Sequence, residues 1–481
     1  MEMKTYHKND NKRIAKNTLM LYFRMILMML ISLYTSRVVL HTLGIRDFGT
    51  YNIVGGLVVL FTFINQSMVG TSQRFLNFEL GKNDEKEAAR VFSMSINCQV
   101  IIICLLMILG ETIGLWFLNA YIKIPYDRLA AANWVYQLSL LTTCANVFYA
   151  PYNGAIIAHE RMSVYAYVSV FEAVVKLGMV YVLLLVDSDK LIFYGFLMLL
   201  STLLVCGIYI CYCLRNFGIC KYHFVKDADL FKRIIGFSGW SLFGSAANLG
   251  ISQGLNIIQN LFFGVAVNAA MGVAQQVNGA LNRFVGNFVT AYNPQIVKSY
   301  ASGDRVYFMR LISMTSKLSY FLLFIIGLPV VICCNDILHI WLKEVPEHAS
   351  SFCQIMIMYS LVEALTSPLW IAVQAYGKIK RYQLTISFIK MSTIPISVLC
   401  LYLGGRPEYV LVTYLLIDSI MHVYRLAFLR TAIQLDVMSY VRSVIFPCLA
   451  ISILSIPVPL LMHTYLNGIV WLSVIIVVSV V

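Results

Sequence analysis

Charged side chains interrupt several long apolar stretches of this sequence. Inside a membrane, each charge costs several kcal/mol unless it faces water or a partner. A guanidinium binds phosphate or diphosphate oxygens bidentately, whereas a buried carboxylate holds a proton or binds a cation. Each of these residues is therefore expected to have a partner or to face a wet cavity. The basic ones are Arg24, Arg37, Lys176, Arg283 and Lys390, and the acidic ones are Glu111, Glu172, Glu363 and Asp418.

Arg24 and Arg37 both lie in the first apolar stretch. Arg24 is only ~10 Å from the expected cytoplasmic end of its helix, at 1.5 Å per residue. It either extends to the cytoplasm or binds a diphosphate in a cavity. Arg37 falls on nearly the opposite helix face, at about 100° per residue, so Arg24 is the stronger candidate ligand. Arg425 lies near the cytoplasmic end of its stretch and is expected to extend to the cytoplasm.

Arg283 lies near the middle of its stretch, where polar residues recur along two adjacent predicted helices. These residues are Asn248, Ser252, Asn256 and Asn260 on one helix and Gln275, Asn278 and Asn282 on the next. Such amides either hydrogen-bond neighbouring helices or line a hydrated cavity that binds sugar hydroxyls. The deep arginine favours the cavity. The candidate ligands for phosphate or sugar are Arg24, Arg283, Lys176, Lys390, Asn248, Asn256 and Asn282.

Two groups of acidic residues are the candidates for ion coupling. Glu172 and Lys176 have i,i+4 spacing with Glu first, the favourable order for an ion pair. They form a structural pair, or a cavity pair that opens when a phosphate or proton competes. Glu363 and Asp418 lie near the middle of their stretches, and each is a candidate to carry a proton or bind Na⁺. Lys390 occupies nearly the place of Lys176 in the second half of the chain. The histidines have no metal-ligand spacing, so no metal is expected.

The composition predicts an all-α polytopic membrane protein. Of the 481 residues, 59% are hydrophobic and 12% are charged, against about 25% charged in soluble domains. A helix needs about 20 apolar residues to cross the bilayer, which places about fourteen spans. We predict them over residues 17–41, 48–77, 90–118, 130–158, 163–186, 191–214, 233–262, 267–297, 306–341, 350–376, 382–403, 408–430, 441–463 and 467–481.

The distribution of basic residues predicts the orientation. The N-terminal tail and the even-numbered loops are rich in Lys and Arg, which places them in the cytoplasm. The net charge of +13 then needs no nucleic acid. The odd-numbered loops hold only Arg46, Lys123, Arg128, Lys190, Lys343 and Arg406 of the 36 basic residues. The short loops leave no room for a separate enzyme domain, and no GxxxxGK[ST] loop for ATP is present.

An internal repeat divides the chain into two halves. "PYNGAIIAHERMSVY" at 151–165 resembles "PLWIAVQAYGKIKRY" at 368–382, and "KRIAKNT" at the first span resembles "KRIIGFS" at the seventh. Spans 1–6 thus repeat as spans 7–12 with the same orientation, as a parallel repeat. We predict a cytoplasmic tail over 1–16, a six-helix bundle over 17–214, a cytoplasmic linker over 215–232, a second bundle over 233–430 and two additional helices over 431–481. The matched residues are Pro151/Pro368, Ala155/Ala372, Ala158/Ala375 and Tyr165/Tyr382.

The segment "NKRIAKNTLMLYFRMILMMLISLYTSRVVLHTLGIRDFGTYNIV" resembles the polysaccharide-transporter (Wzx-like flippase) family of the multidrug/oligosaccharidyl-lipid/polysaccharide exporter superfamily. So does "GTSQRFLNFELGKNDEKEAARVFSMS", where Arg74 and Gly81 close the second span. The resemblance continues through the later spans to the end of the chain. It implies a MATE-like fold, with two six-helix bundles around a central cavity plus two extra helices.

The resemblance also implies an activity. A flippase of this family is thought to move undecaprenyl-diphosphate-linked oligosaccharide from the inner to the outer leaflet of the bacterial cytoplasmic (inner) membrane by alternating access. The product serves lipopolysaccharide O-antigen, capsule or exopolysaccharide synthesis. The implied partners are the lipid-linked oligosaccharide, membrane lipids, and the polysaccharide polymerase and glycosyltransferases. No cofactor is expected beyond an H⁺ or Na⁺ coupling ion.

Two other functions, a multidrug exporter and a polymerase or glycosyltransferase, are alternatives to the flippase. A cation-coupled multidrug exporter of the same fold would have a net acidic cavity, whereas five bases against four acids favour an anionic substrate. A polymerase or lipid-linked glycosyltransferase would need a sizeable outer loop with catalytic residues, and the predicted outer loops are short. The flippase is therefore the first hypothesis and the exporter the alternative.

Overall fold

The computed structural model describes most of residues 17–461. The stretches left out within this range are 32–33, 36–37, 40–41, 45–46, 48–49, 52–53, 55–61, 121–125, 186–188, 343–344 and 458. The tail over 1–16, Arg37 and the last predicted span over 467–481 lie outside the described residues. Every regular element in the described part is helical, which confirms the all-α prediction. The chain forms two compact units, Met1–Leu242 and Phe243–Val481.

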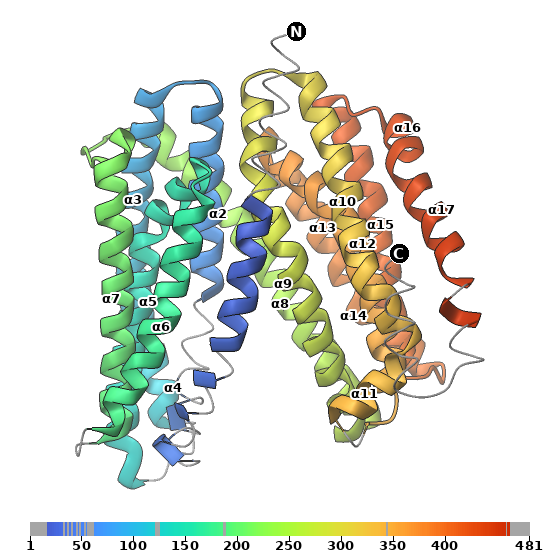
Figure 1. Ribbon diagram of the computed structural model, residues 1–481, viewed down its shortest axis with the longest axis horizontal. Helices are drawn as coiled ribbons and strands as arrows, with labels where there is room; N and C mark the ends of the chain where they lie inside the picture. The colour runs from blue at the N-terminus through green and yellow to red at the C-terminus, as the bar shows by residue number, and fades with distance from the viewer. Residues whose placement is uncertain are drawn as a thin grey trace. The chain divides into compact units, whose positions relative to one another are not determined.

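Unit 1 is a bundle of antiparallel helices (Figure 1). A helix over Asn17–Ile31 comes first. It is followed by α2 (Thr62–Gly81), α3 (Glu85–Leu109), α4 (Leu115–Ala120), α5 (Leu129–Ala158), α6 (Met162–Leu184) and α7 (Lys190–Asn216). Helix α5 is central, since it packs against α2, α3, α6 and α7.

Unit 2 repeats this packing. It takes most of α8 (Ala228–Phe263), whose first residues belong to unit 1. The further helices are α9 (Val265–Ala301), α10 (Arg305–Ile332), α11 (Cys334–Leu342), α12 (Ala349–Tyr376), α13 (Lys380–Met391), α14 (Thr393–Tyr402), α15 (Glu408–Ile433), α16 (Val437–Tyr440) and α17 (Phe446–Ser455). Helix α12 packs against α9, α10 and α15, as α5 packs against α2, α3 and α7. The additional helix α17 lies against α10.

Loop geometry supports the internal repeat independently of residue identity. Three loops of each half contain one residue in the left-handed region, at matching places in the chain. The pairs are Gly44 and Gly264, Asn83 and Gly303, and Glu160 and Gly377. Asp84 and Asp304, which follow the second pair, both cap the next helix by accepting backbone N–H bonds. The two halves therefore share their turns as well as their order of helices.

Two predicted spans are interrupted. The span expected over 382–403 is divided into α13 and α14 at Ser392. Pro395 explains the break, because proline lacks the N–H for the helical hydrogen bond and its ring clashes with the preceding turn. The span expected over 306–341 is divided into α10 and α11 at Cys333. There, Asn335 and Asp336 favour a helix start over a helix interior.

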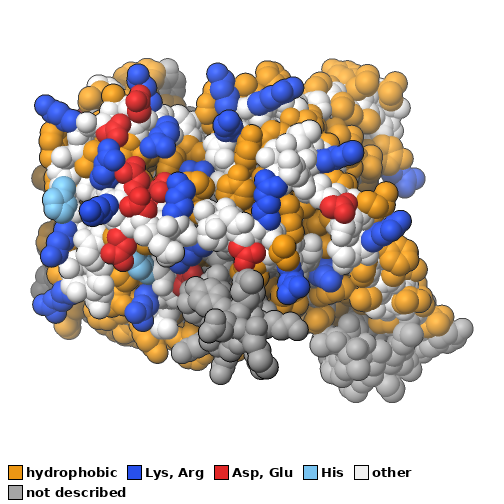
Figure 2. All heavy atoms as spheres, turned by 90° about the horizontal axis from the view of Figure 1, so that it is seen from above, with side chains coloured by type: hydrophobic (Ala, Val, Ile, Leu, Met, Phe, Trp, Pro, Cys, Tyr) orange, Lys and Arg blue, Asp and Glu red, His pale blue; other side chains and the backbone are white. Residues whose placement is uncertain are grey.

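Nine helices in the described part are long and apolar enough to cross a membrane. Helices α2, α5 and α9 are long but more polar, and they are not among the nine. The chain is thus a multi-pass membrane protein, and its helices are roughly consistent with the predicted number of about fourteen spans. In each unit, Lys and Arg side chains recur at the end where its even-numbered loops lie, which is the end seen in Figure 2.

Candidate functional site

The polar residues of α6 form one face inside unit 1. Tyr165, Ser169, Glu172 and Lys176 are spaced three or four residues apart, so they share one side of the helix. Arg24 reaches this face from the first helix. Its guanidinium lies 4.5 Å from the centre of the Tyr165 ring and donates to Ser169 Oγ at 3.2 Å. Arg24 is thus held within the bundle and is partly buried.

Two more tyrosines complete what we call the first-unit cluster. Tyr149 of α5 and Tyr209 of α7 stack with ring centres 5.2 Å apart. Ser169 donates to the carbonyl of Tyr165 at 2.8 Å, and Glu172 lies within electrostatic range of both rings. Cations, hydroxyls and aromatic faces therefore meet at one place, a combination suited to a phosphorylated sugar. The cluster consists of Arg24, Tyr149, Tyr165, Ser169, Glu172, Lys176 and Tyr209.

The Glu172–Lys176 pair is closed in this structure. Lys176 Nζ lies 2.5 Å from Glu172 Oε1, and both side chains keep about a third of their surface exposed (34% and 29%). The i,i+4 spacing explains the contact. The pair is half-buried and partly open to water, so a phosphate or a proton can compete for either partner.

Arg425 lies at the centre of a second cluster, in unit 2, and hydrogen-bonds to two of its neighbouring helices. Its Nε donates to Tyr382 Oη at 2.6 Å, and its Nη1 donates to the carbonyl of Thr366 at 2.9 Å. The expectation that Arg425 extends to the cytoplasm is wrong. Its guanidinium instead ties α15 to α12 and α13, because buried acceptors on both helices need donors. Tyr382 matches Tyr165 in the sequence repeat, and each ring has an arginine within 6 Å (5.9 and 4.5 Å).

The carboxylates of Glu363 and Asp418 lie within electrostatic range of each other and of Lys390 and Arg425. Asp418 is only 7% exposed, and its Oδ2 has no hydrogen-bond partner among the described residues. His422, one turn further along α15, is also buried with both ring nitrogens unpaired in the described structure. The two acids thus share one buried region with two bases and an unpaired histidine.

Tyrosines line the second-unit cluster as they line the first. Tyr359 and Tyr414 stack with ring centres 4.6 Å apart, and their hydroxyls are hydrogen-bonded at 3.1 Å. Lys390 Nζ lies 5.5 Å from the Tyr414 ring centre. The second-unit cluster consists of Tyr359, Glu363, Tyr382, Lys390, Tyr414, Asp418, His422 and Arg425.

The amide stripes on α8 and α9 divide between two roles. Asn256 accepts a hydrogen bond from Gln275 at 3.0 Å, which joins α8 to α9. Asn278 accepts from Ser360, which joins α9 to α12, and Asn282 donates to Asn278 at 3.3 Å. Asn256 and Asn278 therefore connect helices, whereas the bond of Asn282 stays within α9. Asn248 is exposed instead.

Arg283 is exposed, in contrast to the clustered bases. It is the middle residue of α9, about 27 Å from each helix end at 1.5 Å per residue. No hydrogen bond or ion pair to a described residue engages its guanidinium. An unpaired arginine at this depth is costly in hydrocarbon, so its surroundings must be wet or anionic.

Most charged members of the two clusters were predicted from sequence, but the residues around them were not. Sequence reasoning missed Tyr149, Tyr209, Tyr359, Tyr414, Ser169 and His422. One signal was available: Tyr165 and Tyr382 are a matched pair in the repeat. The i,i+4 spacing of Asp418 and His422 was a second signal.

No protein-family model matches the chain, and no curated protein matches it. Several solved structures do match. A mutant MATE has a TM-score of 0.77 at 11% identity, over 88% of this chain and 96% of that one. An outward-facing multidrug resistance MATE family transporter of the MOP superfamily has a TM-score of 0.74 at 12% identity, with the same coverage.

A third match is a MOP superfamily transporter from Pyrococcus furiosus, for which reverse polarity of the binding pocket is said to suggest a different function. Its TM-score is 0.73 at 11% identity, over 88% of this chain and 96% of that one. At these identities the likeness shows the fold. The chain is a multi-pass helical membrane protein, and its fold is that of the MATE transporters of the MOP superfamily.

Proposed function

We propose that the protein is a flippase, which moves undecaprenyl-diphosphate-linked oligosaccharide from the inner to the outer leaflet of a bacterial cytoplasmic membrane. The MATE-like fold supports a transporter that works by alternating access. The orientation that we propose places the N-terminus in the cytoplasm, as the basic even-numbered loops favour. We also retain the proposed division into two six-helix bundles, joined by a linker and followed by additional helices.

Arg283 is the observation that carries the substrate class. It is exposed at the middle of a 37-residue helix and has no partner in the described structure. A diphosphate supplies the anion that this guanidinium lacks, through bidentate hydrogen bonds. A cationic drug would be repelled by the same residue. The substrate most consistent with Arg283 is therefore anionic.

The two clusters supply the other functions of such a site. In the first-unit cluster, Arg24 and Lys176 lie beside tyrosine rings that suit sugar faces. In the second-unit cluster, Glu363 and Asp418 are our candidates for the coupling ion, H⁺ or Na⁺. The unpaired Oδ2 of Asp418 is free to take a proton or contact a cation. Asn248, exposed on α8, is an additional candidate for a sugar hydroxyl.

The experiment that tests the proposal uses cells from which the gene has been deleted. Complete lipid-linked oligosaccharide should accumulate on the cytoplasmic leaflet, and the intact gene should restore surface polysaccharide. A gene carrying Arg283→Ala should fail to restore it although the protein is inserted normally. Arg381→Ala is the matched control, because Arg381 is also exposed but lies in the first turn of α13. Normal surface glycan with no accumulated intermediate would refute the proposal.

A multidrug exporter is the second candidate. One of the matching structures is a multidrug resistance MATE family transporter, and the partly buried Glu363 and the buried Asp418 suit cation exchange. This function predicts that deletion sensitises cells to cationic dyes and leaves polysaccharide unchanged. Purified protein in liposomes would then move a cationic dye in response to a proton or Na⁺ gradient, and Arg283→Ala would not abolish that movement.

A further inference from the structure

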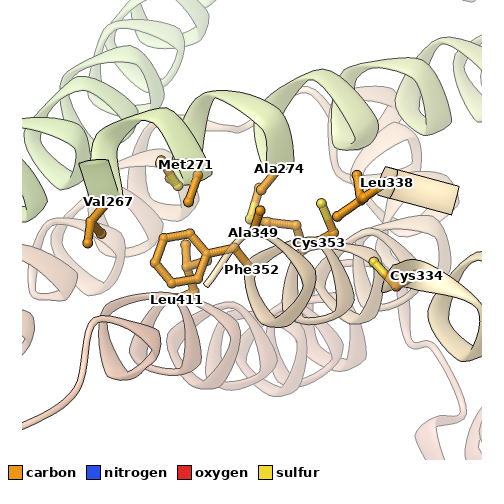
Figure 3. Packing of buried hydrophobic residues seen from close by; sticks show 11 residues of the cluster. Val267, Met271, Ala274, Cys334, Leu338, Ala349, Phe352, Cys353 and Leu411 are labelled. Atoms are coloured by element: carbon orange, nitrogen blue, oxygen red, sulfur yellow. The ribbon is translucent and has the colours of Figure 1, made fainter. Parts of the chain in front are cut away.

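Two buried thiols face each other at one end of unit 2. Cys334 is the first residue of α11, and Cys353 is in the second turn of α12. They are 2% and 0% exposed, respectively, within an apolar cluster that includes Met271 and Phe352. Figure 3 shows both sulfur atoms among these apolar side chains. The two thiols belong to the same cluster and lie within electrostatic range of each other, and Cys334 Sγ donates to the carbonyl of Ser350 at 3.6 Å.

A second buried dithiol lies in unit 1. Cys213 is in the last turn of α7, and Cys220 ends the short helical turn that follows. Both are 0% exposed and lie within electrostatic range of each other, and Cys213 Sγ donates to the carbonyl of Tyr152 at 3.5 Å. The two pairs are therefore alike in burial and in their hydrogen bonds.

The pairs differ in the side of the membrane to which the topology assigns them. Cys334 and Cys353 flank the loop between α11 and α12, an odd-numbered loop. Cys213 and Cys220 lie at the even-numbered loop between α7 and α8. Under the proposed orientation, the first pair is at the outer face and the second at the cytoplasmic face. Disulfides persist in an oxidising outer compartment and are rare in the reducing cytosol.

We propose that Cys334 and Cys353 are a site of disulfide formation on the outer face, whereas Cys213 and Cys220 remain a dithiol. The oxidant is a protein disulfide of the outer compartment, by thiol–disulfide exchange. Cys334 and Cys353 lose two protons and two electrons as their sulfur atoms join, and the disulfide of the oxidant is reduced to two thiols. The bond ties α11 covalently to α12 and closes the loop between them.

Neighbouring Cys333 provides a control within the same segment. It is also buried, but Cys334 and not Cys333 is the cysteine within electrostatic range of Cys353. Adjacent residues of a helical segment point about 100° apart, so only one of the two sulfurs can face α12. The proposed bond is therefore specific to Cys334.

The test uses the full chain in intact cells. The cells are quenched with acid and the protein is denatured in the presence of N-ethylmaleimide, so that buried free thiols are also blocked, and the protein is then purified and digested without reductant for mass spectrometry. We expect a disulfide-linked peptide pair containing Cys334 and Cys353, with N-ethylmaleimide on Cys213 and Cys220. Cys333→Ser should keep the linked pair. Cys334→Ser should remove it and leave Cys353 modified by N-ethylmaleimide.

Two results would overturn the inference. The first is N-ethylmaleimide on all four cysteines of the wild-type protein, which would mean that no bond forms. The second is a bond between Cys213 and Cys220 with the other pair modified, which would place that pair at the oxidising face and reverse the orientation. Neither result depends on transport activity, so the outcome is separate from that of the flippase test.

Discussion

Replacement of Arg425 tests whether the second-unit cluster holds the helices of unit 2 together. Arg425 donates to Tyr382 Oη at 2.6 Å and to the carbonyl of Thr366 at 2.9 Å. A hydrogen bond to a charged group contributes about 1.5–3 kcal/mol, although polar contacts between membrane helices average about 0.6 kcal/mol. Arg425 also lies within electrostatic range of the buried Asp418, so its removal leaves that carboxylate with less compensating charge.

We therefore expect Arg425→Met to lower the free energy of unfolding by about 3 kcal/mol. Arg425→Lys keeps the charge but loses the fork that serves two acceptors, so a loss of about 1.5 kcal/mol is expected. Tyr382→Phe removes one acceptor and should also cost about 1.5 kcal/mol. The measurement is unfolding by SDS titration in mixed micelles, with exposed Arg381→Met as the control.

A double-mutant cycle makes the prediction specific. Arg425→Met and Tyr382→Phe remove the same hydrogen bond, so their combined loss should fall short of the sum by about 1 kcal/mol. A free energy of unfolding for Arg425→Met within about 0.5 kcal/mol of the wild-type value would refute the prediction. Strict additivity of the two substitutions would refute the proposed bond itself.

Three further predictions concern helix ends and close packing. Asp84→Ala removes the cap of α3 and should cost about 1 kcal/mol, measured by thermal unfolding in detergent. The pKa of Asp227 lies below its ordinary value, mainly because its carboxylate accepts a hydrogen bond from the backbone N–H of Leu230. Nearby arginines contribute further to this lowering of the pKa. The ionised form therefore stabilises the fold at neutral pH, and the advantage of wild type over Asp227→Asn should be lost as pH falls below about 4. Gly114→Ala places a Cβ against the Tyr136 hydroxyl, and this clash should lower the free energy of unfolding by about 1–3 kcal/mol. It should also break the hydrogen bond from Tyr136 to the Gly110 carbonyl (2.8 Å). The expected result is increased protease sensitivity.

Each of these predictions has a result that would contradict it. An Asp84→Ala protein as stable as wild type would show that the cap contributes nothing in detergent. A difference between Asp227→Asn and wild type that did not shrink as the pH fell below about 4 would mean that ionisation is not its cause. Unchanged protease sensitivity in Gly114→Ala would show that the turn over Gly110–Gly114 and α5 can separate enough to accept the methyl group.

The helices that bury the functional side chains could be predicted only in part. Apolar length alone located α6, α7 and α15 to within a few residues, because a helix must be long and apolar to cross a bilayer. The break at Ser392 was missed, although Pro395 is visible in the sequence. A proline can kink or divide a membrane helix, and the packing around it decides which.

The candidate site was predicted as a set of charges without their neighbours. Mid-span position identified Glu363 and Asp418, because a charge in hydrocarbon is expensive wherever it occurs. Their shared region needs the contacts of α12, α13 and α15, which no spacing within one helix specifies. Arg425 lies near a helix end, and that position predicted an exposed residue. In the fold, its guanidinium instead donates to two buried acceptors, on α12 and α13.

By itself, the sequence determined that the chain is an all-α membrane protein with an internal repeat. Hydrophobic length, the distribution of basic residues and matched motifs are local properties, so they can be read along one chain. Tertiary structure alone decided which side chains meet. Arg24 on Tyr165, Arg425 on Tyr382 and Cys334 beside Cys353 are contacts between different helices. Such contacts depend on the rotation and packing of each helix against its neighbours, which residue spacing within a single span does not fix.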